Sequence, residues 1–64
     1  MNGGSNIEIP TGLGMALAQN PQAMQNFAVM TNEQKQAVID RTHTLASKKE
    51  MRSLVDSIGN NRFF

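Results

Sequence analysis

Residues 47–59 read SKKEMRSLVDSIG and form the clearest helical segment of the chain. The segment opens on Ser47 with Glu50 three residues later, a capping box in which both side chains satisfy backbone N–H groups at a helix start. Apolar residues follow at i, i+3, i+4 and i+7, the spacing of one helix face. They are Met51, Leu54, Val55 and Ile58. Gly59 stops the pattern in the manner of a glycine C-cap, so a helix is predicted over residues 48–58.

Three further helices are predicted upstream. Thr31 and Gln34 form another capping box, which opens a helix expected to reach Ala46. Asn20 and Pro21 combine a strong N-cap residue with a proline suited to the first helical position. Apolar residues at helical spacing indicate one more helix before them. The sequence therefore predicts an all-α bundle of four short helices, over residues 12–19, 21–29, 32–46 and 48–58.

The four helices are expected to enclose one apolar core. Phe27 is predicted to be its central residue, because it is the one large aromatic inside the helical body. On the second helix the apolar face is expected to be Met24, Phe27 and Ala28. The predicted core residues are Leu13, Leu17, Met24, Phe27, Val38, Leu45, Met51, Leu54, Val55 and Ile58.

Length and composition limit the class of protein. With 64 residues the chain can form one small domain, expected over residues 11–59, with a flexible arm at 1–10 and a tail at 60–64. It has no cysteine, which excludes disulfides and thiolate metal sites. A net charge of +1 is too balanced for a general polyanion binder. No apolar run is long enough for a membrane span or a secretory signal, so a cytoplasmic location is expected.

Catalytic groups are sparse. His43 is the only histidine and is expected at the border between its helix's apolar face and solvent. No carboxylate pair is spaced for acid–base chemistry on one helix face, and no phosphate-binding loop follows a strand. The sequence therefore predicts a protein that is not an enzyme and that has no cofactor and no metal site.

A basic cluster marks the start of the last helix. Lys48, Lys49 and Arg52 lie away from the apolar face, and cations at a helix N-terminus oppose the helix dipole, so local stability does not account for them. Three readings stay open, namely a solvated face, a contact with nucleic acid or another anion, and a contact with protein. Lys35 and Arg41 are further cations near this part of the chain, but the sequence does not determine where they lie relative to the cluster.

A protein-interaction module is the function that the sequence favours, with weak nucleic-acid binding as the alternative. Methionine is frequent in the helical body, and this flexible residue lines adaptable binding surfaces as well as small cores. Phe63 and Phe64 end the chain and are candidate partner contacts, whether the tail folds back onto the core or stays exposed. The partner is an unidentified protein or, since small folds gain stability by association, a second copy in a homodimer.

The chain resembles the helical C-terminal segment of the YdeI/OmdA-like bacterial proteins. The shared positions are Pro10, Leu13, Ala16, Leu17, Asn20, Ala23, Phe27, Thr31, Lys35, Gln36, Ser47, Met51, Arg52, Leu54 and Val55. It is also similar to short stand-alone proteins of Gram-positive anaerobes that carry the residues seen here at 14–20 and 49–51. The resemblance implies a helical fold and a bacterial source. It implies no reaction, and of the family's basic residues only Lys48 and Arg52 have counterparts here.

Overall fold

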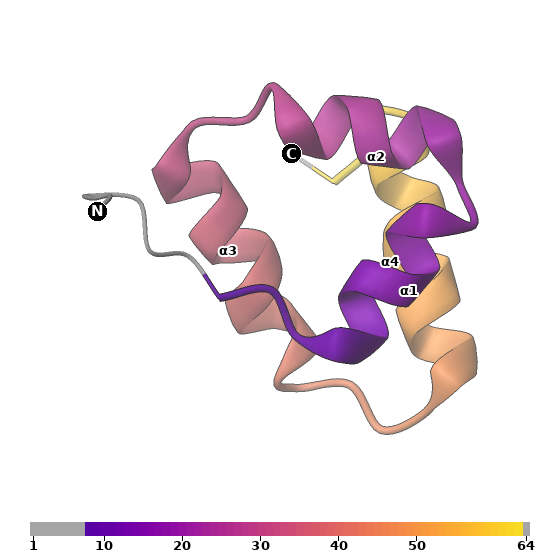
Figure 1. The fold of residues 1–64 in the computed structure, drawn as a ribbon. Helices are drawn as coiled ribbons and strands as arrows, with labels where there is room; N and C mark the ends of the chain where they lie inside the picture. The colour runs from indigo at the N-terminus through magenta and orange to yellow at the C-terminus, as the bar shows by residue number, and fades with distance from the viewer. Residues whose placement is uncertain (1–7, 64) are drawn as a thin grey trace.

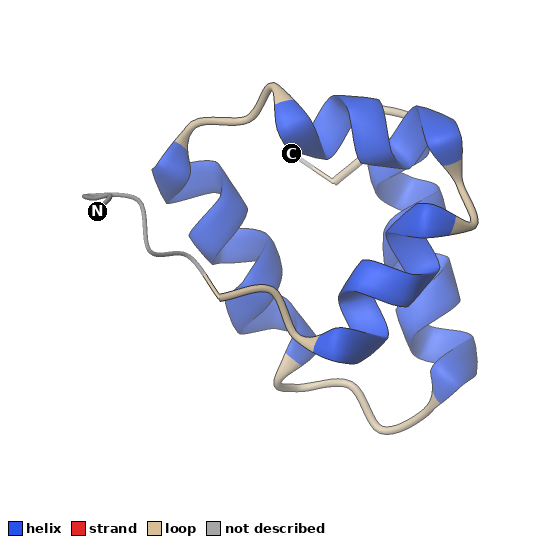
Figure 2. Ribbon diagram, in the orientation of Figure 1, coloured by secondary structure: helices blue, strands red, loops and turns tan. Residues whose placement is uncertain are grey.

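The computed structural model describes residues 8–63 and shows an all-α fold within them (Figures 1 and 2). The helices are α1 (Thr11–Ala18), α2 (Pro21–Ala28), α3 (Asn32–Thr42) and α4 (Lys48–Gly59). Their number and order are those predicted. Residues 8–10 precede α1 without helix or strand. The rest of the expected N-terminal arm, and Phe64 at the other end, lie outside the described residues.

Side-chain caps fix the starts of three helices. The Asn20 side chain accepts a hydrogen bond from the Ala23 backbone N–H at 3.2 Å and so caps α2. At α3 the whole capping box is present, with Thr31 and Gln34 each bonding to the other's backbone N–H at 3.1 Å. These contacts confirm the caps predicted from the sequence.

The cap of α4 differs from the predicted box by one residue. Ser47 Oγ accepts from the Glu50 backbone N–H at 3.2 Å, as expected. The Glu50 carboxylate, however, accepts from the Ala46 backbone N–H at 2.9 Å, rather than from that of Ser47. The carboxylate therefore holds the connection that enters α4 as well as the first turn of the helix.

The prediction that the third helix reaches Ala46 is wrong, because α3 ends at Thr42. Its last turn tightens, with backbone N–H groups of residues 43–45 bonding to carbonyls three residues earlier. Two threonine hydroxyls take part, since Thr42 donates to the Ile39 carbonyl at 2.6 Å and Thr44 to the Arg41 carbonyl at 2.8 Å. Such local hydrogen bonds from side chains compete with the backbone hydrogen bonds that would continue the helix. The helix therefore ends here, and the chain turns toward α4.

At the end of α4 the glycine is not the stopping residue. Gly59 is the last helical residue, and Asn61 takes the left-handed conformation with φ of 58°. The Arg62 N–H bonds to the Ser57 carbonyl at 2.7 Å, and the Asn61 N–H to the Ile58 carbonyl at 3.1 Å. This is a Schellman motif with asparagine at C′. It reverses the chain, so that Phe63 packs against the core.

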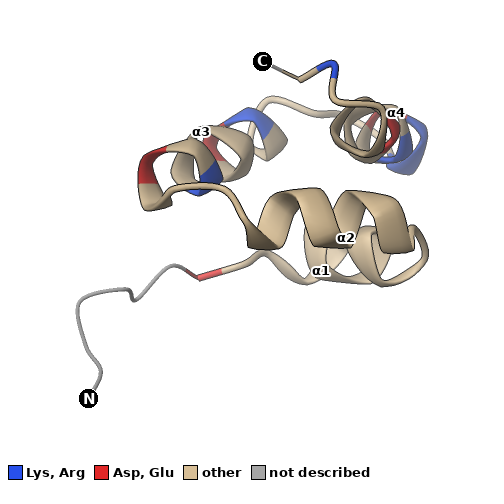
Figure 3. Cartoon of the chain, turned by 90° about the horizontal axis from the view of Figure 1, so that it is seen from above, with Lys and Arg blue, Asp and Glu red and all other residues tan. Residues whose placement is uncertain are grey.

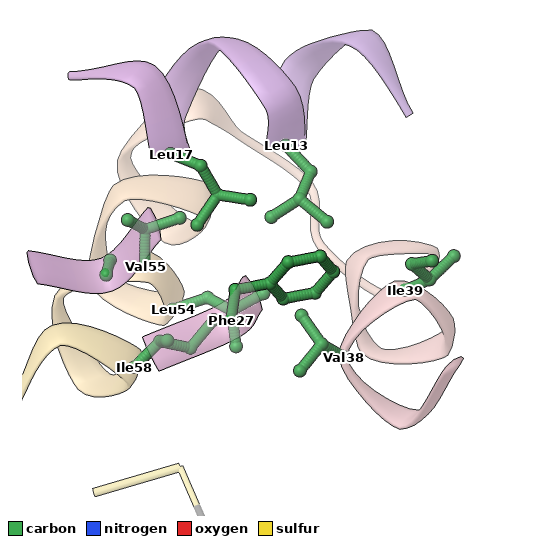
Figure 4. Close-up of a cluster of buried hydrophobic side chains, with 9 residues drawn as sticks. Leu13, Leu17, Phe27, Val38, Ile39, Leu54, Val55 and Ile58 are labelled. Atoms are coloured by element: carbon green, nitrogen blue, oxygen red, sulfur yellow. The ribbon is translucent and has the colours of Figure 1, made fainter. Parts of the chain in front are cut away.

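The core lies where the helices meet, with Phe27 at its centre and only 3% exposed (Figure 4). Its ring lies between Leu13 of α1 and Val38 of α3. The Lys35 ammonium lies 5.9 Å from the centroid of the same ring, within reach of a cation–π contact. The buried apolar residues are Leu13, Leu17, Ala23, Phe27, Val38, Ile39, Leu54, Val55 and Ile58.

Three predicted core residues occupy other places. Met24 is 39% exposed, while Ala23 is fully buried, so α2 is rotated from the predicted face. The rotation follows from close packing on α4, where a Cβ on Gly59 would lie 3.4 Å from the backbone nitrogen of Ala23. Leu45 and Met51 are half-buried at the edge of the core.

The helix α4 is the element on which α1 and α2 pack most closely. Polar bonds join α4 to α2 as well, since Asn26 donates to the Ile58 carbonyl at 2.8 Å. The helix α3 packs less closely on the other three than they pack on one another, and Figure 1 shows it standing to one side of them. Two sides of α4 are therefore not covered by another helix. One lies between α3 and the tail, and the other lies between α1 and the connection of residues 43–47 that joins α3 to α4.

Candidate binding grooves around the last helix

Charge is confined to one part of the described fold. Neither α1 nor α2 carries a charged residue. Apart from Glu8, the charged side chains of residues 8–63 lie on α3, α4 and the tail (Figure 3). A hollow between α1 and α4 therefore receives its charge from the α4 side alone.

The first hollow, the α1–α4 groove, has a volume of about 580 Å³. Met15 and Met51 line it, and Met15 is 61% exposed. Within residues 8–63, the charged residues that line it are Lys48 and Arg52, two cations without a carboxylate. The remaining lining residues are Gly12, Ala16, Gln19, Thr42, Leu45, Ala46 and Ser47.

The second hollow, the tail cleft, has a volume of about 680 Å³ and lies on the next face of α4. Three cations line it, and they come from three elements: Arg41 from the last turn of α3, Lys49 from the first turn of α4, and Arg62 from the tail. Glu50 supplies the one carboxylate that the described residues bring to this lining. The other lining residues are Leu45, Ser53, Leu54, Ser57 and Phe63.

The predicted basic cluster is exposed as expected, and its residues line two different hollows. Lys48 and Arg52 lie one turn apart and line the α1–α4 groove, whereas Lys49 lines the tail cleft. The division follows from helix geometry, because residues i and i+4 share a face and residue i+1 lies about 100° away. Two adjacent lysines therefore belong to two different sites.

The tail folds back onto the core, which is one of the two arrangements that the sequence left open. Phe63 is half-buried, packs against the core and lines the tail cleft, so it is not wholly exposed as a partner contact. Phe64 was the second predicted contact and lies outside the described residues.

Sequence reasoning missed Arg62 and Met15 as residues of these hollows, and it named Arg41 without placing it. Arg41 and Arg62 lie 8 positions before and 13 positions after Lys49 in the chain, and only the turn after α3 and the Schellman motif bring them to one cleft. Met15 was read as part of the structured body, but it is mostly exposed. The sequence does indicate that Met15 is exposed, because this residue falls outside the apolar face formed by Leu13 and Leu17.

Other kinds of site find little support in the described residues. No group of three or more His, Cys, Asp or Glu side chains among residues 8–63 is placed to hold a metal ion. His43 is exposed at the C-cap of α3, just beyond the helix that was expected to carry it. None of the four described helices is long and apolar enough to cross a bilayer.

Comparisons of the chain with protein-family models, with curated proteins and with solved structures found no match. The resemblance to the YdeI/OmdA-like proteins therefore stays a prediction.

Proposed function

We propose that this chain is a small, non-enzymatic protein-interaction module of the bacterial cytoplasm, and that it binds its partner in the α1–α4 groove. The observation that carries the proposal is the pairing of exposed methionine with cations in one hollow. Met15 and Met51 supply flexible thioether side chains, which adapt to the shape of a partner. Lys48 and Arg52 border them, with no carboxylate in the lining.

The occupant that fits this groove is an acidic amphipathic helix of another protein. Such a helix places apolar side chains into a groove at helical spacing. Lys48 and Arg52 are four residues apart on α4, a rise of about 6 Å along its axis. Carboxylates three or four residues apart on the partner helix match this spacing. Charge complementarity of this kind sets partner choice and association rate more than affinity.

A selection experiment tests the proposal. A library of random 16-residue peptides is selected for binding to the wild-type chain, and the enriched sequences are measured individually. We expect enrichment of peptides with large apolar residues at helical spacing flanked by Asp or Glu. Binding should weaken at least about tenfold in Arg52→Glu, since a charge-assisted contact becomes a repulsion. Met15→Ser should weaken it as well, because apolar contact area is lost.

Lys49→Glu is the matched control, because this lysine is adjacent to Lys48 but lies outside the groove. The same selected peptides should bind this variant as tightly as the wild type. Enrichment of basic peptides, or equal binding to Arg52→Glu and wild type, would contradict the proposal. Sedimentation at two concentrations adds a further outcome: self-association that is lost in Met15→Ser would make a second copy the occupant and overturn the acidic partner.

A second candidate function is binding of a nucleic-acid backbone at the start of α4. Its support is the exposure of all three predicted residues, Lys48, Lys49 and Arg52. Affinity for duplex DNA should then fall with salt at a log–log slope of about −2.7, for about three phosphate contacts. The double change of Lys48 and Lys49 to Glu should abolish it. An absence of amide shifts at residues 48–52 on adding DNA at low salt would exclude this candidate.

A further inference from the structure

The tail cleft gathers three cations that play no part in the proposed partner groove. Arg41, Lys49 and Arg62 are half of the chain's six Lys and Arg residues. Among the described residues the lining has one carboxylate beside these cations, that of Glu50, which already accepts the Ala46 N–H at 2.9 Å. The lining therefore carries a formal charge of +2 (three cations less one carboxylate), in a chain whose net charge is +1. Gathering like charges in a small fold is unfavourable without a counter-charge.

The floor of the tail cleft is apolar. Leu54 is 8% exposed, and the half-buried Leu45 and Phe63 lie at the edge of the same core. Along α4 the cleft follows the face that carries Lys49, Ser53 and Ser57, a rise of about 12 Å at 1.5 Å per residue. Cations thus border an apolar floor over a length greater than that of a simple inorganic anion.

The size of the hollow suits a small molecule. Ligand pockets are clefts of about 300–1,000 Å³ with mostly apolar linings and a few polar groups that fix orientation. The tail cleft, at about 680 Å³, falls in this range. Guanidinium groups such as those of Arg41 and Arg62 are suited to bidentate contact with a carboxylate or phosphate.

We propose that the tail cleft is a binding site for a small amphiphilic anion, a molecule with an apolar body and a carboxylate or phosphate head. The head contacts both Arg41 and Lys49, with Arg62 in the same lining, and the body lies on Leu45, Leu54 and Phe63. This site is separate from the proposed partner groove, because the two linings share only Leu45 among residues 8–63. Either site can therefore fail without the other.

A titration with three probes tests the site. Amide and methyl NMR signals are followed while octanoate, octylammonium or inorganic phosphate is added to the ¹⁵N- and ¹³C-labelled chain. Octanoate and octylammonium share one apolar body and differ in the sign of the head group. We expect octanoate to shift the amides of Ser53, Ser57 and Phe63 with saturation, and to leave the Met15 methyl unmoved. Octylammonium should give no saturable shift there, and inorganic phosphate should bind at least about tenfold more weakly than octanoate.

Variants place the head group. Lys49→Gln and Arg41→Gln should each weaken octanoate binding about tenfold, because each removes a charge-assisted hydrogen bond. Lys48→Gln is the matched control and should change it less than about twofold, since screening by salt weakens the effect of more distant exposed charges. Equal affinity for octanoate and octylammonium, equal effects of the two lysine changes, or no octanoate shift at these residues would each overturn the proposal.

Discussion

Replacing Phe27 with alanine tests the centre of the fold. The side chain is 3% exposed and its ring lies between Leu13 and Val38, so nearly all of its apolar surface is buried. Burying an aromatic side chain removes about 150–250 Å² of its surface area from contact with water. At about 25 cal/mol per Å², this corresponds to about 4–6 kcal/mol for the whole side chain. The alanine that remains retains part of it, which agrees with the range of about 3–5 kcal/mol found for Phe→Ala in cores.

This loss is comparable to the whole stability of the domain. At about 0.05–0.15 kcal/mol per residue, 64 residues give a free energy of unfolding of about 3–10 kcal/mol. Each kcal/mol shifts the melting midpoint of a domain this small by about 4–8 °C. We therefore expect Phe27→Ala to melt at least about 12 °C below the wild type, or to be unfolded at room temperature. The assay is thermal melting followed by circular dichroism at the helical band.

Two comparison variants make the result informative if Phe27→Ala does not fold. Phe27→Leu retains most of the volume and should cost less than about 1.5 kcal/mol, with a cooperative melt. Met24→Ala lies less than one turn away on the same helix but changes a side chain that is 39% exposed, so it should cost less than about 1 kcal/mol. The reasoning would be refuted if Phe27→Ala melted within about 5 °C of the wild type, or if Met24→Ala cost as much as Phe27→Ala.

Three further changes follow from single contacts. Ser47→Ala should destabilise the domain by about 1 kcal/mol in a urea melt, because it removes the cap of α4; no shift would mean that the helix starts elsewhere. Asn26→Ala should cost about 0.5–1.5 kcal/mol by the same assay, since it removes the amide that donates to the Ile58 carbonyl, which keeps its bond from the Asn61 N–H. Gly12→Ala should stabilise by up to about 1 kcal/mol, because the new methyl meets only the Met51 methyl, at 3.7 Å; a loss of stability would indicate a tighter contact there.

The parts of the fold that could be predicted from the sequence are those determined by neighbouring residues. Asn20, Thr31 and Ser47 act within three positions of themselves, so the caps were correctly placed. The end of α3 was misplaced because the apolar stripe continues to Ala46, and no helical pattern reveals that threonine hydroxyls end the helix first. Met24 was misplaced because the rotation of α2 depends on its packing against Gly59, which lies 36 positions from Ala23.

The candidate sites were predictable only in part. Exposure of the basic residues on α4 followed from their angle to the apolar face. Helix geometry places Lys48 and Lys49 about 100° apart, but which hollow each of them lines depends on α1 and on the tail, whose residues lie far from both lysines in the chain. The convergence of Arg41 and Arg62 depends on two chain reversals, so no spacing in the sequence indicates it.

The looser packing of α3 has a consequence for how the molecule opens. Residues 29–47, with α3 among them, form the connection between α2 and α4, which pack closely on each other. If α3 unfolds alone, residues 29–47 become a flexible loop whose two ends are held together by the packing of α2 on α4. The entropic cost of closing such a loop grows only with the logarithm of its length, so even a long loop here costs little. Undocking of α3 exposes Val38 and one side of Phe27 while α1, α2 and α4 stay packed. We therefore expect amide hydrogen exchange to be faster in α3 than in the middle of α4, where exchange should require unfolding of the whole chain.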